Sequence, residues 1–266
     1  MKLTVQGHEA YAYTGGKPFN PALPCVVFIH GALHDHSVWN LLARWCAHHG
    51  WSVLAVDQPG HGRSGGPLLP SVEALADWCL ALLDAAGVQQ AAWVGHSMGS
   101  LIALAAAAKA PERASHLVLM GSAYPMKVSD ALLTMARDTP EAGMDLVNAL
   151  SISSHASKPS YPGPGFWLHG GNRRLMSRVM ASQPGSEVFS HDFELCNRYD
   201  GGLQAAAAVR CQSHVISGQA DQMTPPKAVK ALAQALNAPV TLLPCGHGLM
   251  HECPEQTLAA LRTALA

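Results

Sequence analysis

The sequence is poor in charged residues and has no surplus of basic ones. Only 13% of its 266 residues are Asp, Glu, Lys or Arg, and the formal net charge is −1 with neutral histidines. Proteins that bind nucleic acid through its phosphates carry a clear basic patch, which this balance does not supply. No apolar run approaches the ~18 residues of a membrane-spanning helix. We therefore expect neither a nucleic-acid partner nor a membrane partner.

Paired cysteines and a signal peptide are also missing. The seven cysteines are scattered, and none forms a Cys-x-x-Cys pair. Free thiols are therefore expected instead of a disulfide framework. The first residues lack the apolar region of a signal peptide, which favours a cytoplasmic location.

The 15 histidines raise the question of a metal site. His34, Asp35 and His36 are close together in the sequence, but ligands two residues apart on a loop specify little geometry. No His-Glu-x-x-His or comparable spacing of zinc ligands occurs. A catalytic metal stays a minor alternative, and we expect no metal and no cofactor.

What the sequence does contain is a regular alternation of apolar strands and helices. Continuous apolar runs of this length are typical of parallel strands buried on both faces. The strands are predicted at residues 3–5, 10–13, 25–30, 52–56, 91–94, 116–121, 213–218 and 240–243. The pattern predicts an α/β fold with a mostly parallel central sheet of about eight strands and helices on both faces.

The alternation of strands and helices stops between the predicted strands at residues 116–121 and 213–218. Residues 124–208 contain helical stretches but no convincing buried strand, and Ser, Pro and Gly concentrate at residues 151–171. This composition predicts an inserted, mainly helical cap with one long loop. The predicted division is therefore a core of residues 1–123 and 210–266 and a cap of residues 124–209.

The best-defined motif is Gly95-His96-Ser97-Met98-Gly99, which fits the Gly-x-Ser-x-Gly nucleophile elbow. An apolar strand precedes it at 91–94 and an alanine-rich helix follows it at 101–109. Glycines are needed on both sides because a Cβ there would collide with the crossing strand and helix. The turn exposes the Ser97 hydroxyl at a helix N-terminus, where negative charge is stabilised.

A serine nucleophile needs a base and a group that orients the base. Asp221 follows the strand at 213–218, and His247 follows the last strand. Because the carboxyl ends of parallel strands meet at one edge of the sheet, both are predicted to lie near Ser97. Asp192 and Asp200 are weaker candidates for the acid, since neither follows a strand.

With these residues the chain resembles the α/β-hydrolase superfamily, in particular its capped esterase-like and C–C-hydrolase-like serine hydrolases. The resemblance is carried by His30-Gly31 with Trp39, by Asp57-Gln58-Pro59-Gly60-His61-Gly62-Arg63-Ser64, by the Ser97 elbow, and by residues 218–225 with Gly246-His247. It implies a triad in which Ser97 is the nucleophile, His247 the base and Asp221 its orienting acid. It also implies an oxyanion hole formed by the backbone N–H groups of Met98 and Ala32.

The expected activity is cleavage of a small or medium, partly apolar carboxylic ester through an acyl-enzyme on Ser97. Candidate contacts to this small-molecule substrate are Leu33, His34, His36 and Trp167. The alternatives are hydrolysis of a C–C bond in a meta-cleavage-type diketone, of a lactone or of an amide, or a ligand-binding receptor with a hydrolase fold. The C–C hydrolases of the resembled family usually have a Gly-rich run where this chain has Ala32-Leu33-His34-Asp35, which favours an ester. A monomer and a homodimer both remain open.

Overall fold

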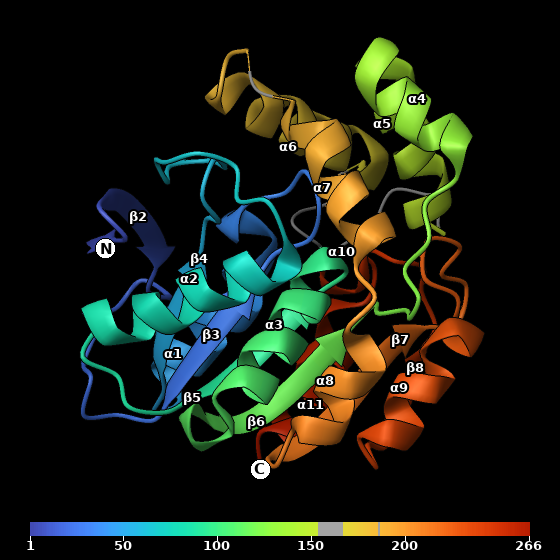
Figure 1. Ribbon diagram of the computed structural model, residues 1–266. Coiled ribbons are helices and arrows are strands. Elements are labelled where there is room, and N and C mark those ends of the chain that lie inside the picture. Colours follow the sequence, from blue (N-terminus) through green and yellow to red (C-terminus); the bar gives the residue numbers. More distant parts are fainter. Residues whose placement is uncertain (154–166, 186) are drawn as a thin grey trace.

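The computed structural model describes residues 1–153, 167–185 and 187–266, and it contains an eight-stranded sheet in the order β1-β2-β4-β3-β5-β6-β7-β8 (Figure 1). The strands are β1 (Lys2–Val5), β2 (His8–Tyr13), β3 (Cys25–Ile29), β4 (Ser52–Val56), β5 (Ala91–His96), β6 (Ala114–Met120), β7 (Gln212–Gly218) and β8 (Val240–Leu243). Strands β1 and β2 pair antiparallel with each other, and β2 pairs antiparallel with β4. All other pairs are parallel. The predicted fold class is confirmed.

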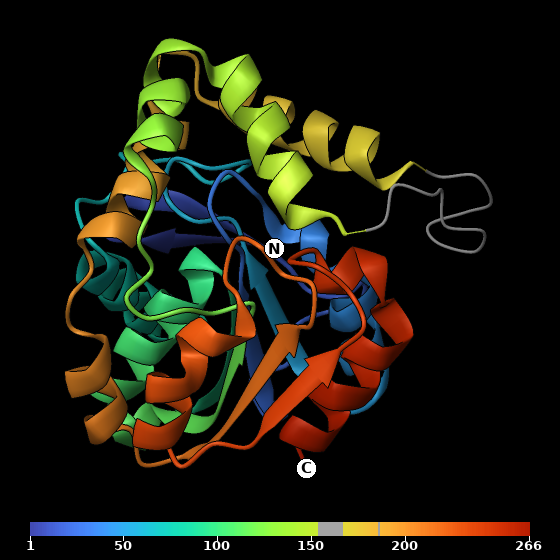
Figure 2. The same ribbon diagram turned by 90° about the vertical axis from the view of Figure 1, so that its right-hand side faces the viewer.

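Helices cover both faces of the sheet, which Figure 2 shows edge-on. One face carries α2 (Val72–Ala85), α3 (Met98–Lys109), α8 (Gly202–Ala208) and α9 (Lys230–Ala235), and the other carries α1 (Asn40–His48) and α11 (Pro254–Ala264). Every residue of β3 and β4 is consequently buried, as their continuous apolar sequences require. Helix α3 is central, and ten of its twelve residues are buried; its alanines allow this close approach.

Four further helices lie over the carboxyl ends of the parallel strands (Figures 1 and 2). We call them the cap helices: α4 (Asp130–Asp138), α5 (Pro140–Ser151), α6 (Leu168–Ser182) and α7 (Val188–Arg198). Helix α8 packs instead on α3 and α9 in the core layer, and the predicted cap boundary at residue 209 remains a prediction. Most of the predicted long loop, residues 154–166, lies outside the described residues.

Short helices complete the architecture. They are η1 (His36–Trp39), η2 (Pro111–Arg113), η3 (Pro226–Val229) and α10 (Leu249–Glu252). In the described part of the chain, no helix combines the length and apolar character needed to cross a membrane.

Candidate active site

Ser97 occupies a strained turn between β5 and α3. Its backbone angles, φ 53° and ψ −122°, are ones that residues other than glycine rarely adopt. A Cβ on Gly95 would lie 2.1 Å from the carbonyl oxygen of Gly99, and one on Gly99 would lie 2.2 Å from that of Ile29. The two glycines are therefore required sterically, and the turn presents Ser97 at the N-terminus of α3.

His247 and Asp221 form a hydrogen-bonded pair at the same edge of the sheet. His247 Nδ1 lies 2.8 Å from Asp221 Oδ2, and both side chains are buried. Since the carboxylate accepts the Nδ1–H, the Nε2 atom of a neutral His247 keeps its lone pair for a proton. The Thr224 hydroxyl also donates to Asp221 Oδ2, at 2.7 Å. Burial favours a higher pKa for Asp221, but the charge and hydrogen bond of His247 and the bonds from Thr224 lower it overall.

The loop that carries His247 is held from several sides. His247 N–H donates to the Ser151 carbonyl at 2.7 Å, and the His247 carbonyl accepts from His96 Nε2 at 2.9 Å. Gly246 N–H donates to Glu252 Oε1 at 3.0 Å. Burial, and then the charge of His247, hold the pKa of His96 well below its ordinary value, so His96 serves as a neutral donor. Because His96 directly precedes Ser97, its bond to the His247 carbonyl connects the elbow to the loop after β8 that carries His247, which we call the histidine loop.

The loop after β3 passes directly beside the elbow. A Cβ on Gly31 would lie 3.0 Å from the Ser97 Cβ, which shows how closely the two backbones approach. Ala32 and Ser97 line the same cavity. Met98 opens α3, where the first N–H groups of a helix have no partner within the helix. The predicted oxyanion donors, Ala32 and Met98, thus both lie near Ser97, and their role stays a prediction.

The cavity next to Ser97 has a volume of about 190 Å³ and is enclosed by both core and cap. Its lining residues are Ala32, Ser97, Met126, Lys127, Val128, Ser129, Leu132, Leu150, Phe193, Cys196, Gln222, Met223 and Thr224. Most of these side chains are apolar. The one cation among them, Lys127, is exposed and donates to the Asn197 carbonyl at 2.9 Å.

The four predicted substrate contacts do not line this cavity. Leu33 is fully buried. The side chains of His34 and His36 are engaged elsewhere: His34 Nε2 donates to Asn172 Oδ1 at 2.9 Å, and His36 Nδ1 lies 2.7 Å from Asp57 Oδ1. Trp167 is 61% exposed and borders a separate hollow between α5 and α6. Substrate contact by these four residues stays a prediction, while the cap brings side chains from α4, α5 and α7 to the cavity.

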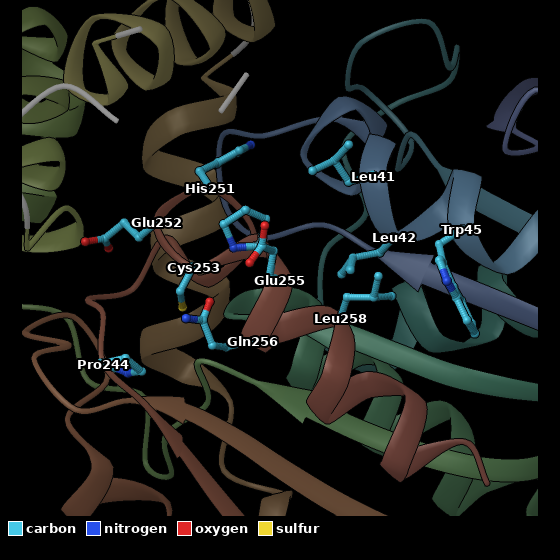
Figure 3. A pocket seen from close by; sticks show the side chains of 11 residues that line it. Leu41, Leu42, Trp45, Pro244, His251, Glu252, Cys253, Glu255, Gln256 and Leu258 are labelled. Atoms are coloured by element: carbon cyan, nitrogen blue, oxygen red, sulfur yellow. The ribbon is translucent and has the colours of Figure 1, made fainter. Parts of the chain in front are cut away.

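A larger groove of about 580 Å³ is lined by a different set of residues (Figure 3). It is bordered by α1, α10 and α11, and it contains none of Ser97, Asp221 and His247. His251, four residues after His247 in the chain, lines this groove. Burial lowers the pKa of His251 to about 4. The size of the groove therefore does not make it the catalytic cavity.

One cluster brings together groups that can bind metals. In the described residues Asp35, His36 and Asp57 place one ligand atom each within 4.8 Å of one another. Their oxygens already accept hydrogen bonds: Asp57 Oδ1 from the His36 N–H at 2.7 Å, and Asp35 Oδ2 from Arg178 at 2.6 Å. This arrangement matches a structural network, and the expectation of no metal stays a prediction.

Three residues that support the site are not predicted in that role from the sequence, which offers Asp192 only as a weaker candidate for the acid. Thr224 and Glu252 hold Asp221 and the histidine loop, and Asp192 binds the loop beside Ala32. Thr224 follows Asp221 by three residues, a spacing that could have suggested a local hydrogen bond. No local signal connects Asp192 with residues 159 positions away.

Together these features define an α/β protein whose serine elbow, strand-end carboxylate and strand-end histidine share one edge of the sheet. The chain belongs to the α/β hydrolase fold family, which residues 24–160, just over half of the chain, match.

Relatives and solved structures extend the likeness over most of the chain. A putative carbamate hydrolase RutD of Caulobacter sp. (strain K31) is 29% identical over 223 residues, 80% of either chain. The enol-lactonase from Burkholderia xenovorans LB400 has a TM-score of 0.85 at 23% identity, covering 100% of this chain and 99% of that one. The esterase EaEST from Exiguobacterium antarcticum has a TM-score of 0.84 at 16% identity, covering 100% and 98%. At these identities the structural matches demonstrate a shared fold.

Proposed function

We propose that this protein is a serine hydrolase that cleaves a small or medium, partly apolar carboxylic ester through an acyl-enzyme on Ser97. The observation that carries the proposal is the 2.8 Å bond from His247 to buried Asp221, beside a serine held on a strained elbow. A strained nucleophile, an oriented base and a buried acid in this arrangement are the parts that acyl transfer needs.

In the proposed mechanism, Ser97 Oγ attacks the acyl carbon while His247 Nε2 takes its proton. The N–H groups of Met98 and Ala32 stabilise the oxyanion, a contribution typically worth about 3–4 kcal/mol per donor. The imidazolium then protonates the leaving alcohol, which departs and leaves the acyl-enzyme. His247 next removes a proton from water, which attacks the acyl carbon. Collapse of this second intermediate releases the carboxylic acid and returns the proton to Ser97.

The cavity supports a compact substrate. A volume of about 190 Å³ accommodates a short acyl or alcohol chain, and its mainly apolar lining suits a neutral group. The single lysine at its edge already donates to a backbone carbonyl, so a strongly anionic substrate is not favoured.

Lactone and carbamate hydrolysis form the second candidate class. The enol-lactonase and the putative carbamate hydrolase named above support this class by their names. The same nucleophile, base and oxyanion donors serve all three reactions, so the choice depends on what the cavity accepts. Short lactones and carbamates therefore belong in the substrate panel beside the esters.

The experiment compares wild-type protein with Ser97→Ala on p-nitrophenyl esters of two to eight carbons and measures fluorophosphonate labelling. We expect the wild type to hydrolyse the short esters, and Ser97→Ala to lose at least about 10³-fold in kcat/KM and all labelling. Ser100→Ala is the matched control, because the Ser100 hydroxyl is bonded to the Ser97 carbonyl and Ser122 Oγ. A Ser97→Ala variant as active as wild type would overturn the mechanism. A wild type with neither turnover nor labelling would favour the receptor alternative.

A further inference from the structure

Asp192, on cap helix α7, connects three segments that are far apart in the sequence. Its carboxylate is 1% exposed. Oδ2 accepts the backbone N–H of Leu33 at 2.8 Å and lies 2.8 Å from His61 Nε2. Leu33 follows Ala32, the proposed oxyanion donor, and His61 belongs to the loop after β4. In the described part of the chain, Asp192 Oδ1 has no hydrogen-bond partner, so this buried carboxylate depends on Leu33 and His61.

The hydrogen bonds of His61 require a charged ring. Nδ1 lies 3.0 Å from the Pro59 carbonyl, and Nε2 faces the Asp192 carboxylate. A carbonyl and a carboxylate oxygen can only accept, so both ring nitrogens must donate. Burial favours a lower pKa for His61, but the charge and hydrogen bond of Asp192, the bond to the Pro59 carbonyl and the charge of Asp57 together raise the pKa overall. His61 and Asp192 therefore form a buried ion pair between core and cap.

The groups around His61 are compatible with this charge. The His30 ring, at the end of β3, lies 5.1 Å from the His61 ring, and burial lowers the His30 pKa to about 4, which keeps His30 neutral. Asp57, at the end of β4, adds a second negative charge that favours the imidazolium. Asp57 therefore favours the protonated form of His61, and neutral His30 places no opposing positive charge beside it.

Leu33 needs an external partner because its own conformation is unfavourable. Its φ of 55° is left-handed, which costs a residue with a Cβ roughly 1–2 kcal/mol. The bond to Asp192 fixes the peptide plane between Ala32 and Leu33, and the neighbouring peptide carries the Ala32 N–H. The cap also contacts the next two residues, through His34 with Asn172 and Asp35 with Arg178. Of these three contacts, only the one from Asp192 binds the backbone.

We propose that Asp192, held by protonated His61, is a positioning residue that orients the Ala32 N–H in the oxyanion hole. This inference rests on the proposed function. It means that the cap contributes to catalysis as well as to the cavity. The loop that carries Ala32 and Leu33 keeps its conformation only while α7 is packed against it. It also predicts that kcat falls at alkaline pH, because deprotonation of His61 breaks the ion pair. One ring nitrogen then has a lone pair that faces the lone pair of an acceptor oxygen, on Pro59 or on Asp192.

The test measures kcat and KM for a short p-nitrophenyl ester with Asp192→Ala and Asp192→Asn. Loss of one oxyanion donor typically costs 10²–10³-fold in kcat. For a misaimed donor we expect Asp192→Ala to lose between about tenfold and a hundredfold in kcat, with KM changed less than about threefold. Asp192→Asn keeps an oxygen that can accept the Leu33 N–H and should recover part of this loss. Arg178→Ala, which breaks a contact from the cap to a side chain of the same loop, is the matched control and should stay within about threefold of wild type.

A second variant tests the charge without removing the carboxylate. His61→Gln offers an N–H close to the position of Nε2 but does not titrate near neutral pH. We expect His61→Gln to keep most of its kcat at pH 7 and to lose the alkaline decline that wild type shows. If Asp192→Ala does not fold, this pH profile decides alone. A wild-type kcat in Asp192→Ala, or the same alkaline limb in His61→Gln, would overturn the inference. Failure of the proposed function is distinguishable, since there either the wild type itself would show no turnover or labelling, or Ser97→Ala would remain as active as wild type.

Discussion

Asp221 shows how one carboxylate can be kept ionised inside the protein. Its Oδ1 accepts the N–H groups of Met223 and Thr224, each at 2.8 Å, and its Oδ2 accepts from the Thr224 hydroxyl and from His247. Each bond favours the charged form, and together they outweigh burial, so the pKa of Asp221 is lowered. A carboxylate that stays ionised keeps His247 in the tautomer that the proposed mechanism needs.

Thr224→Val removes one of these bonds while preserving the shape of the side chain. A hydrogen bond to a buried charged group is worth about 2 kcal/mol, and we expect the free energy of unfolding to fall by about that amount at pH 7. Because the pKa of folded Asp221 is depressed, its stabilisation is present above about pH 4 and is lost as the pH falls. The difference between variant and wild type should therefore shrink in acid.

Urea unfolding at pH 7 and near pH 3 measures this difference. Thr263→Val is the control, since the exposed Thr263 hydroxyl bonds only to the Ala259 carbonyl of its own helix. Its effect should stay within about 0.5 kcal/mol. An equal deficit for Thr224→Val at both pH values would contradict the account of Asp221.

At the scale of elements, the cap helices decide the shape of the cavity. Leu132 comes from α4, Leu150 from α5, and Phe193 and Cys196 from α7. The core contributes the elbow, Ala32 and the loop after β7. The core elements therefore supply the groups that are proposed to break bonds, and the cap supplies most of the apolar surface that selects a substrate.

Leu150→Ala enlarges the cavity from the α5 side. Leu150 is only half-buried, so the change should cost little stability and should admit a longer acyl chain. Each additional buried methylene is worth about 0.8 kcal/mol, and we expect the ratio of kcat/KM for hexanoate over butyrate to rise at least about threefold. Hydrolysis rates over the series of p-nitrophenyl esters measure this ratio.

Leu146→Ala provides the matched control on the same helix. Leu146 is also half-buried and packs against buried apolar residues of the core. It does not line the cavity. Its chain-length preference should equal that of wild type. A parallel shift in both variants would mean that loosening of α5, and not the volume beside Ser97, sets the preference.

At the scale of the whole molecule, the cap and the core are joined by buried carboxylates. Asp35, near η1 in the core, accepts from Ser37 and from Arg178 of α6. Burial alone would raise the pKa of Asp35, but the bonds from Ser37 and Arg178 lower it to about 2. Asp192 makes the equivalent connection from the cap side. These charges therefore each contribute to the attachment of the cap.

We expect the cap to loosen in acid before the core unfolds. A carboxylate with a depressed pKa stabilises the fold above about pH 4 and loses that contribution as the pH falls toward 2. Hydrogen exchange, corrected for its intrinsic pH dependence, should show protection lost first in α6 and later in α3. Asp35→Asn should weaken α6 protection already at pH 7. Simultaneous loss in both helices would contradict this order.

How far the sequence predicts the molecule depends on how local each signal is. The strands were found because residues buried on both faces must be apolar throughout, as in β3 and β4. The prediction for the cap stopped at its helical character, since its helices alternate with no strand. Likewise the place of His36 and Trp167 in the chain predicts substrate contact, but it does not reveal that His36 is bonded to Asp57 or that Trp167 is exposed to solvent.

The sequence by itself determined the strand order along the chain, the glycines of the elbow and the candidates Ser97, Asp221 and His247. These follow from short-range physics: backbone sterics at Gly95 and Gly99, and residues that come directly after buried strands. Only the tertiary structure decided which cap side chains enclose the cavity and which group binds the Leu33 N–H. Asp192 and Leu33 are 159 residues apart, and a contact across that distance depends on how cap and core pack, which no local pattern records.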